Sequence, residues 1–204
     1  LIVHPGPTQG TLVNALLYYP GTLSDGESED RPGIVHRLDQ FTEGLMVIAK
    51  NNKAHEHLKN QFKAREVTKK YIAMIKGDPK WENIVITKPL GRHPKKRNRM
   101  TTHQTKGIDM KDAKTTVKVI NRFNTKTLVE AIPETGRMHQ IRVHLASTHH
   151  PVLGDVDYSS DPKQKNTDKK NQNNYLLQAY YLNFKHPMKE LKLGFRLNYS
   201  KRIL

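Results

Sequence analysis

Cysteine is absent from the 204-residue chain, which excludes disulfides, thiolate nucleophiles and cysteine-ligated zinc sites and fits a reducing compartment. Long apolar runs are absent too, since none approaches the ~18 residues of a membrane-spanning helix. The sequence has no Gly-Lys-Ser/Thr phosphate loop, no Gly-x-Gly-x-x-Gly fingerprint and no Gly-x-Ser-x-Gly nucleophile motif. Nucleotide hydrolysis and cofactor redox chemistry therefore have no visible site, and carboxylate, guanidinium, phenol and imidazole groups are left for chemistry.

Acidic residues are scarce relative to basic ones. The chain has 19 Asp and Glu against 35 Lys and Arg, a formal net charge of +16 and a pI near 9.9. Contacts of Lys and Arg with phosphates, with counterion release, supply the sequence-independent part of nucleic-acid affinity. The charge therefore favours a polyanionic partner, and a merely solubilising charge is the alternative.

The length fits one packed domain, and we predict a single domain over residues 1–204. Polar insertions interrupt it at residues 24–32, 92–114 and 159–174, and the last is a low-complexity stretch that we expect to be a flexible loop. The chain begins at Leu1 rather than Met and has no signal-peptide pattern, so we expect further residues upstream.

Apolar spacing predicts an α+β fold. Helical periodicity indicates three helices, with Thr11 and either Asn51 or Asn52 as candidate N-caps. These helices cover residues 10–19, 51–65 and 139–148. Alternating or continuous apolar patterns predict strands at residues 44–50, 69–77, 83–90, 115–123, 127–134 and 189–197. The mixture indicates a mixed or mostly antiparallel central sheet flanked by helices and loops.

The segment GIVHRLDQFTEGLMVIA, residues 33–49, places His36, Arg37 and Asp39 directly ahead of an apolar run. Loops at the ends of rigid elements commonly carry catalytic groups, so Asp39 is a catalytic candidate. Arg37 points to the same side if the segment is extended. The pattern alone also fits a structural Arg–Asp ion pair, which is the commoner arrangement.

A second cluster, ETGRMHQIRVHLASTHHPVLGD, spans residues 134–155. Gly136 allows a sharp turn into the predicted helix, and the planar fork of Arg137 at that turn suits a carboxylate or a phosphate. The histidines raise the alternative of a metal site. We predict no metal, because His139 and His144 are five residues apart and diverge on a helix, with no nearby carboxylate to complete a ligand set.

Tyr71, in VTKKYIAMIKG, is a third candidate. A tyrosine on a strand is most often a half-buried core residue. Beside a basic pair it can also stack on a nucleic-acid base, and the pattern leaves both roles open.

Five blocks of the sequence resemble, in order and spacing, the RluA/RluD-type family of RNA pseudouridine synthases. They are HPGPTQGTLVNALL, RPGIVHRLDQFTEGLMVIAKN, FKAREVTKKYIAMIKG, PLGRHPKKRNRM and GRMHQIRVHLASTHHPVLGDVDY, and the likeness extends from about His4 to Leu197. The resemblance implies the pseudouridine synthase fold, with an active-site cleft in the middle of the sheet. It also implies isomerisation of uridine to pseudouridine in RNA without cofactor or metal.

The resemblance implies a role for each candidate. Asp39 matches the family's catalytic carboxylate, and whether it acts as nucleophile or base stays open. Arg137 should pair with Asp39 and keep it ionised and oriented, and Tyr71 should contact the uracil. Arg37 should enter the RNA stack once the target uridine has been flipped out, because its sugar cannot be reached inside a helix.

The resemblance also implies surfaces around the site. Leu38 and Ile141 are expected to form an apolar pocket wall. The basic loop, residues 92–99, is expected to grip the phosphates that flank a stem-loop. The full set of expected RNA contacts is His36, Arg37, Arg92, Lys95, Lys96, Arg97, Arg99, His139 and Arg142.

Three positions depart from the family pattern. Glu43 stands where Ser or Thr is usual and adds negative charge near Asp39, Met138 replaces a common Thr, and Gln178 replaces a usual His. The separate N-terminal RNA-binding domain of many relatives is also not found in this sequence.

Glu43 and the missing N-terminal domain motivate an alternative function, a catalytically impaired RNA-binding or ribosome-assembly factor with the same fold. A metal-dependent nuclease would need clustered carboxylates that the sequence lacks. The expected partner is ribosomal RNA, especially of the large subunit, with transfer RNA as the alternative, and we expect a monomer with no membrane partner. The expected location is the cytoplasm, and a mitochondrion or plastid is the alternative.

Overall fold

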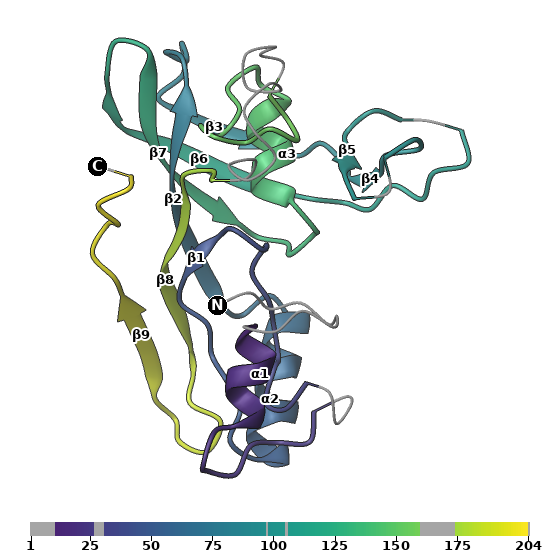
Figure 1. Ribbon diagram of the computed structural model, residues 1–204, viewed down its shortest axis with the longest axis vertical. Helices are drawn as coiled ribbons and strands as arrows, with labels where there is room; N and C mark the ends of the chain where they lie inside the picture. The colour runs from purple at the N-terminus through teal and green to yellow at the C-terminus, as the bar shows by residue number, and fades with distance from the viewer. Residues whose placement is uncertain (1–10, 27–30, 97, 105, 160–173, 204) are drawn as a thin grey trace. The chain divides into compact units, whose positions relative to one another are not determined.

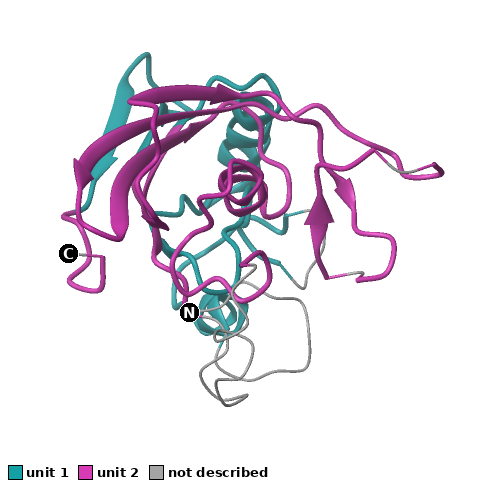
Figure 2. Cartoon of the chain, turned by 90° about the horizontal axis from the view of Figure 1, so that it is seen from above, with its two compact units in different colours: residues 1–68, 181–197 teal, residues 69–180, 198–204 magenta. Residues whose placement is uncertain are grey.

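The structure is a computed structural model that describes residues 11–26, 31–96, 98–104, 106–159 and 174–203 (Figure 1). Arg97 and nearly all of the expected polar loop at 159–174 lie outside the described residues. The chain divides into two compact units, one of residues 1–68 and 181–197 and the other of residues 69–180 and 198–204 (Figure 2). Each unit is described by itself below, and the single domain expected from the sequence stays a prediction.

The first unit contains two helices with conventional N-caps. Helix α1 (Leu12–Leu17) begins after Thr11, which forms a capping box with Asn14. Helix α2 (Asn52–Lys63) begins after Asn51, whose side chain accepts a hydrogen bond from the Ala54 N–H at 2.8 Å. Both helices and both caps confirm the sequence-based expectation.

Three strands complete the first unit. They are β1 (Glu43–Gly44), β9 (Lys192–Arg196) and the second half of β8 (Leu177–Lys185), with β8 bonded to both of the others and antiparallel to β9. The apolar core combines α2 with β8 and the segments beside them, and its buried members are Ala49, Leu58, Val67, Leu182 and Phe184.

The strand expected at residues 44–50 is largely wrong. Only Gly44 lies in a strand, and beyond it the segment makes a single isolated bridge, Ile48 with Ile34. The backbone is satisfied in other ways, because the Val47 N–H donates to a histidine ring and the Ala49 N–H donates to the Gly33 carbonyl at 2.8 Å. Gly33 is needed there, since it has φ +72° and a Cβ would lie 2.7 Å from the Ala49 carbonyl oxygen.

The second unit is an antiparallel sheet with one helix against it. Strands β2 (Thr68–Lys76), β7 (Lys126–Pro133), β6 (Thr115–Arg122) and β3 (Asn83–Ile86) follow one another in that order, and β8 neighbours β2. Helix α3 (Gln140–Ala146) packs against β6 and β7. These four strands and α3 were expected from the sequence, whereas β8 was not.

Two features of this unit position the candidate residues. Four consecutive residues of β2, from Ile72 to Ile75, are buried, so both faces of the strand are covered and its position is fixed. The short strands β4 (Gly91–Arg92) and β5 (Met100–Thr101) pair with each other and bracket the basic loop, which Figure 1 shows extending beside α3.

The predicted α+β class is confirmed. In the described parts of the chain, no helix is long and apolar enough to cross a membrane.

Candidate functional site

In the first unit, the loop that carries Asp39 alternates in burial. Arg37 is exposed, Leu38 is only 9% exposed and Asp39 is half-buried. The Asp39 carbonyl accepts a hydrogen bond from the Thr42 N–H at 3.0 Å, which closes a turn directly after the candidate carboxylate. The buried Leu38 anchors the loop, and Arg37 and Asp39 on either side of it are more exposed.

His36 fixes the start of this loop. Its Nε2 accepts a hydrogen bond from the Val47 N–H at 3.0 Å, and its ring stacks on Phe62 of α2 with centroids 4.5 Å apart and 23° between the planes. An Nε2 that accepts carries no proton, so the ring is engaged inside the unit through this nitrogen. The structure thus gives His36 an anchoring role, and its predicted RNA contact stays a prediction.

In the second unit, residues 136–139 form a turn before α3 that we name the Arg137 corner. The Arg137 N–H donates to Oε1 of Gln140 at 3.0 Å, and the Arg137 Nε donates to the Asp112 carbonyl at 3.1 Å. The Gln140 side chain also bonds Thr135 Oγ1 at 2.7 Å and the Lys114 carbonyl at 3.0 Å. The corner is therefore held by a buried amide whose hydrogen bonds are made on both its oxygen and its nitrogen.

The start of α3 lies one residue after the predicted start at residue 139. The N-cap residue is His139, with φ 54° and ψ 18°, and its side chain makes no capping hydrogen bond. Arg137 precedes the helix, at the turn where the sequence analysis placed it. Because α3 has only seven residues, the corner owes its shape to side-chain hydrogen bonds more than to the helix itself.

Tyr71 lies on β2 opposite Ala131 and is half-buried. Lys69, two positions earlier on the same face of the strand, is a residue that the sequence analysis missed. Burial lowers the pKa of Lys69 below its usual value, and its Nζ lies 3.6 Å from where a Cβ on Gly136 would stand. The second unit thus brings Lys69, from the same strand as Tyr71, close to the Arg137 corner. The pairing of Arg137 with Asp39, which lies in the other unit, stays a prediction.

Arg142 does not fit its predicted role as an RNA contact. Its side chain is 3% exposed, and its Nε and Nη2 donate to the two carboxylate oxygens of Asp155 at 2.7 and 2.8 Å. Nη2 also bonds Asp157 at 2.9 Å, and the guanidinium carbon lies 5.0 Å from the Tyr158 ring centroid and 4.2 Å from that of Tyr175. A guanidinium enclosed in this way binds the protein's own carboxylates rather than a phosphate.

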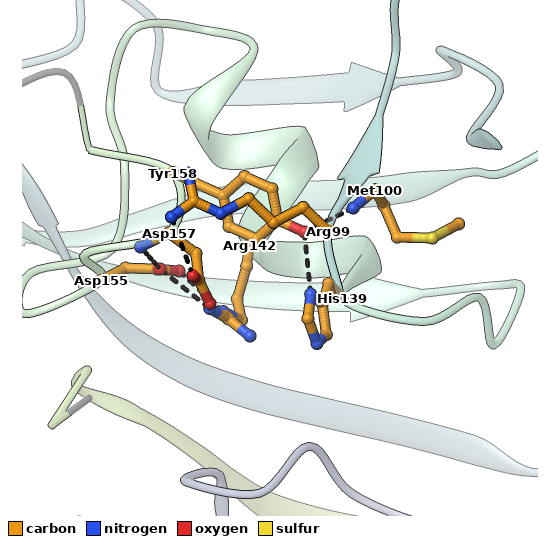
Figure 3. A network of polar contacts seen from close by, with 7 residues as sticks. All are labelled: Arg99, Met100, His139, Arg142, Asp155, Asp157 and Tyr158. Carbon is orange, nitrogen blue, oxygen red and sulfur yellow. Dashed lines mark hydrogen bonds and ion pairs between the residues drawn. The ribbon is translucent and has the colours of Figure 1, made fainter. Parts of the chain in front are cut away.

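The basic loop is attached to this cluster through Arg99. The Nη2 of Arg99 lies 3.1 Å from Oδ1 of Asp157, so one carboxylate bridges Arg99 and Arg142 (Figure 3). Arg92, Lys95 and Lys96 are exposed, as phosphate-binding residues must be. The loop thus presents its cations to solvent while its end is tied to the protein.

Two histidines of the second cluster, His144 and His139, make hydrogen bonds within the unit, and the predicted RNA contact of His139 stays a prediction. His144 is fully buried, and its ring bonds Thr115 Oγ1 and the Lys88 carbonyl, both at 2.9 Å. His139 bonds the Tyr158 hydroxyl through Nδ1 at 2.8 Å. Within the described ranges, no group of three or more His, Asp or Glu side chains is arranged to hold a metal ion. The expected wall residues Leu38 and Ile141 are both buried, each in its own unit, and the pocket they were predicted to line stays a prediction.

Comparison with known proteins identifies the class to which these elements belong. The model of the RNA pseudouridylate synthase family matches residues 2–147. The chain therefore belongs to this family, which confirms the resemblance drawn from its motifs.

Individual relatives agree with this assignment. The chain is 46% identical over 197 residues to an uncharacterized RNA pseudouridine synthase of Aquifex aeolicus, which covers 93% of this chain and 60% of the relative. It is 41% identical over 165 residues to the ribosomal large subunit pseudouridine synthase D of Haemophilus ducreyi, covering 80% of this chain and 48% of that protein. The structure of human RNA pseudouridylate synthase domain containing 1 matches with a TM-score of 0.70 at 27% identity, covering 80% of this chain and 67% of the other. The chain spans about half to three fifths of the length of these two curated relatives.

Proposed function

We propose that this protein is an RNA pseudouridine synthase that isomerises specific uridines in structured RNA. The observation that carries the proposal is the loop of residues 36–39, which presents Asp39 and Arg37 outward from the buried Leu38 in a chain of the pseudouridylate synthase family. In the reaction the bond between the ribose anomeric carbon and uracil N1 breaks, the uracil turns, and a bond forms from the same carbon to C5. The proton leaves C5 and N1 gains one, so atoms and electrons balance without a cofactor or a metal.

Each candidate has a role in this proposal. Asp39 acts on the target uridine as nucleophile or base, and Arg137 pairs with it and keeps it ionised. Tyr71 contacts the uracil and assists in removing the C5 proton. Arg37 occupies the space that the flipped uridine leaves in the RNA stack, and its exposure supports this role.

The basic loop supports the choice of RNA as substrate. Its exposed Arg92 ends strand β4, the exposed Lys95 and Lys96 lie between β4 and β5, and the net charge of the chain is +16. Structured RNA is recognised largely through its shape and backbone, which suits such a loop. We propose large-subunit ribosomal RNA as the target because several relatives are named ribosomal large subunit pseudouridine synthase D, with transfer RNA as the alternative. We further propose a cytoplasmic monomer.

The test compares the wild type with an Asp39→Asn variant. Each protein is incubated with unmodified large-subunit ribosomal RNA and, separately, with transfer RNA transcripts, and pseudouridine is mapped chemically at single-nucleotide resolution. Asp109→Asn is the matched control, since its carboxylate is 81% exposed and contacts only the exposed Lys111 among the described residues. New sites with the wild type and Asp109→Asn, but not with Asp39→Asn, are the expected result.

Two other results would contradict the proposal in different ways. If Asp39→Asn forms the same pseudouridine sites as the wild type, the Asp39 carboxylate is not catalytic. No sites with any protein, together with tight, salt-dependent RNA binding by all three, would favour the RNA-binding or assembly factor.

A further inference from the structure

The Arg137 corner contains a backbone conformation that needs support. His139 has a positive φ of 54°, which is uncommon for a residue other than glycine, and it lies two positions after Arg137. A residue held in this region persists only where its surroundings determine it, and such residues gather at functional sites. His139 lacks a capping hydrogen bond of its own, so the support comes from another part of the chain.

That support is Tyr158. Its hydroxyl lies 2.8 Å from Nδ1 of His139, and the two rings meet edge to face with centroids 5.8 Å apart. The same hydroxyl accepts a hydrogen bond from the Met100 N–H of β5 at 2.8 Å. Figure 3 shows the hydroxyl between these two groups, which come from segments far apart in the sequence.

The direction of both hydrogen bonds follows from the partners. The Met100 N–H can only donate, so it uses a lone pair of the hydroxyl oxygen. Among the described residues the one remaining partner of the hydroxyl is Nδ1 of His139, which therefore receives the hydroxyl proton. Burial raises the pKa of Tyr158 above its usual value, so the phenol keeps that proton at neutral pH. His139 is thereby fixed with its proton on Nε2.

The Tyr158 ring is itself held in place. It lies beside the Arg142 guanidinium, which is locked by Asp155 and Asp157, and Asp157 also pairs with Arg99 at the end of the basic loop. The hydroxyl thus stands on a buried, rigid base and contacts β5 on one side and the Arg137 corner on the other.

We propose that Tyr158 is a positioning residue for the reaction proposed above: its hydroxyl holds the Arg137 corner in one arrangement with the strand that ends the basic loop. This inference rests on the proposed function, because it assigns Arg137 to the pairing with the catalytic carboxylate. Tyr158 does not contact the substrate. It acts through His139 and Met100 on the residues that do.

The test is a Tyr158→Phe variant, which removes the hydroxyl and keeps the ring beside Arg142. Under single-turnover conditions with saturating RNA, the rate constant for pseudouridine formation should fall about 10- to 100-fold, because small misplacements of a reacting group cost that much. The Kd for RNA should stay within about threefold of the wild type, since the exposed cations of the basic loop are retained. Tyr199→Phe is the matched control, because its hydroxyl makes no hydrogen bond within the described part of the chain and the ring is likewise half-buried.

A second measurement uses the wild type alone. The ¹⁵N chemical shifts of His139 should show an unprotonated Nδ1 and a protonated Nε2, and a protonated Nδ1 would overturn the proposal. An unchanged rate constant in Tyr158→Phe, with an active wild type, would overturn it as well. Failure of the wild type itself to form pseudouridine would instead overturn the proposed function, and the two failures are therefore distinguishable.

Discussion

The Asp39 loop and the Arg137 corner are both irregular segments that carry candidate catalytic groups, but they are held in different ways. The Asp39 loop is fixed by one buried leucine and one histidine ring, which meets a backbone N–H and an aromatic ring. The Arg137 corner is fixed by two polar side chains, the buried Gln140 and the half-buried Tyr158, that bond several backbone segments. A polar network of this kind fixes the orientation of the segment as well as how deeply it is buried. We therefore expect the Arg137 corner to be more sensitive to single substitutions than the apolar anchor of the Asp39 loop.

The largest effect is expected from Arg142→Met. This change leaves the carboxylate of Asp155, which is fully buried, without its bidentate partner. Breaking a buried pair in this way should lower the free energy of unfolding by about 3–5 kcal/mol, measured by urea denaturation. Lys114→Met breaks the ion pair of Lys114 with Glu134, whose side chains are 46% and 47% exposed, and should lower the free energy of unfolding by less than about 1 kcal/mol. Equal losses of stability in the two variants would contradict the expected difference between buried and exposed pairs.

Gln140→Leu and Gln61→Leu compare two buried amides, one in each unit. Gln61 bonds the N–H and the carbonyl of Lys185 at 2.8 and 2.9 Å, so both variants leave backbone groups unpaired. Each should lower the free energy of unfolding by about 1–3 kcal/mol. Only Gln140→Leu should also slow pseudouridine formation in a single-turnover assay, because only Gln140 accepts from the Arg137 N–H. A similar loss of rate in both variants would mean that general destabilisation is the cause.

His36→Leu tests the anchor of the Asp39 loop. The leucine keeps apolar contact with Phe62 but leaves the Val47 N–H without its acceptor, which should cost about 1–2 kcal/mol of unfolding free energy. The rate of pseudouridine formation should fall more than in Phe62→Leu, which removes the ring stack and keeps the hydrogen bond. The comparison of the two rates at equal RNA saturation checks this, and the reverse order would show that stacking is the main anchor.

The smallest effect is a pH dependence at His144. Burial lowers the pKa of its imidazole below the usual 6.5, although the Lys88 carbonyl favours the protonated form. The unfolded chain then binds a proton that the native ring does not. The resulting stability is present above pH 6.5 and is lost as the pH falls toward the lowered pKa, with a slope of at most about 1.4 kcal/mol per pH unit.

His144→Gln should flatten that slope in urea denaturation between pH 7.5 and 5, since the glutamine does not titrate in this range. A wild type with equal stability across the range would count against the buried neutral ring.

Local patterns in the sequence were sufficient for most of the fold. Thr11 and Asn51 cap helices because their side chains bond the backbone three residues ahead, a property written in the local sequence. Strand β8 escaped prediction because it is buried almost throughout its length, so neither face shows polar alternation. The strand predicted at residues 44–50 was largely wrong because an apolar run resembles a strand in sequence. Its pattern does not show that the Val47 N–H donates to a histidine ring instead of to a neighbouring strand.

Motifs in the sequence indicate candidate site residues, whereas the groups that hold these residues in place depend on tertiary contacts. Arg142 looks like any other cation of a basic chain, and nothing in its spacing shows that Asp155 and Asp157 fold back upon it. The approach of Lys69 to Gly136 and the contacts of Tyr158 are likewise tertiary. Family resemblance supplies roles for Asp39, Tyr71 and Arg137, whereas the groups that hold them in place could be seen only in three dimensions.

The division of the chain has a consequence for synthesis on the ribosome. The first unit needs residues 181–197, which are translated after the whole stretch from 69 to 180. The opening segment of the first unit, including the Asp39 loop, therefore cannot complete its folding until most of the second unit has been synthesised. Of the two candidate regions, the Arg137 corner can be built first during translation, and the Asp39 loop acquires its complete support only after residues 181–197 have been synthesised.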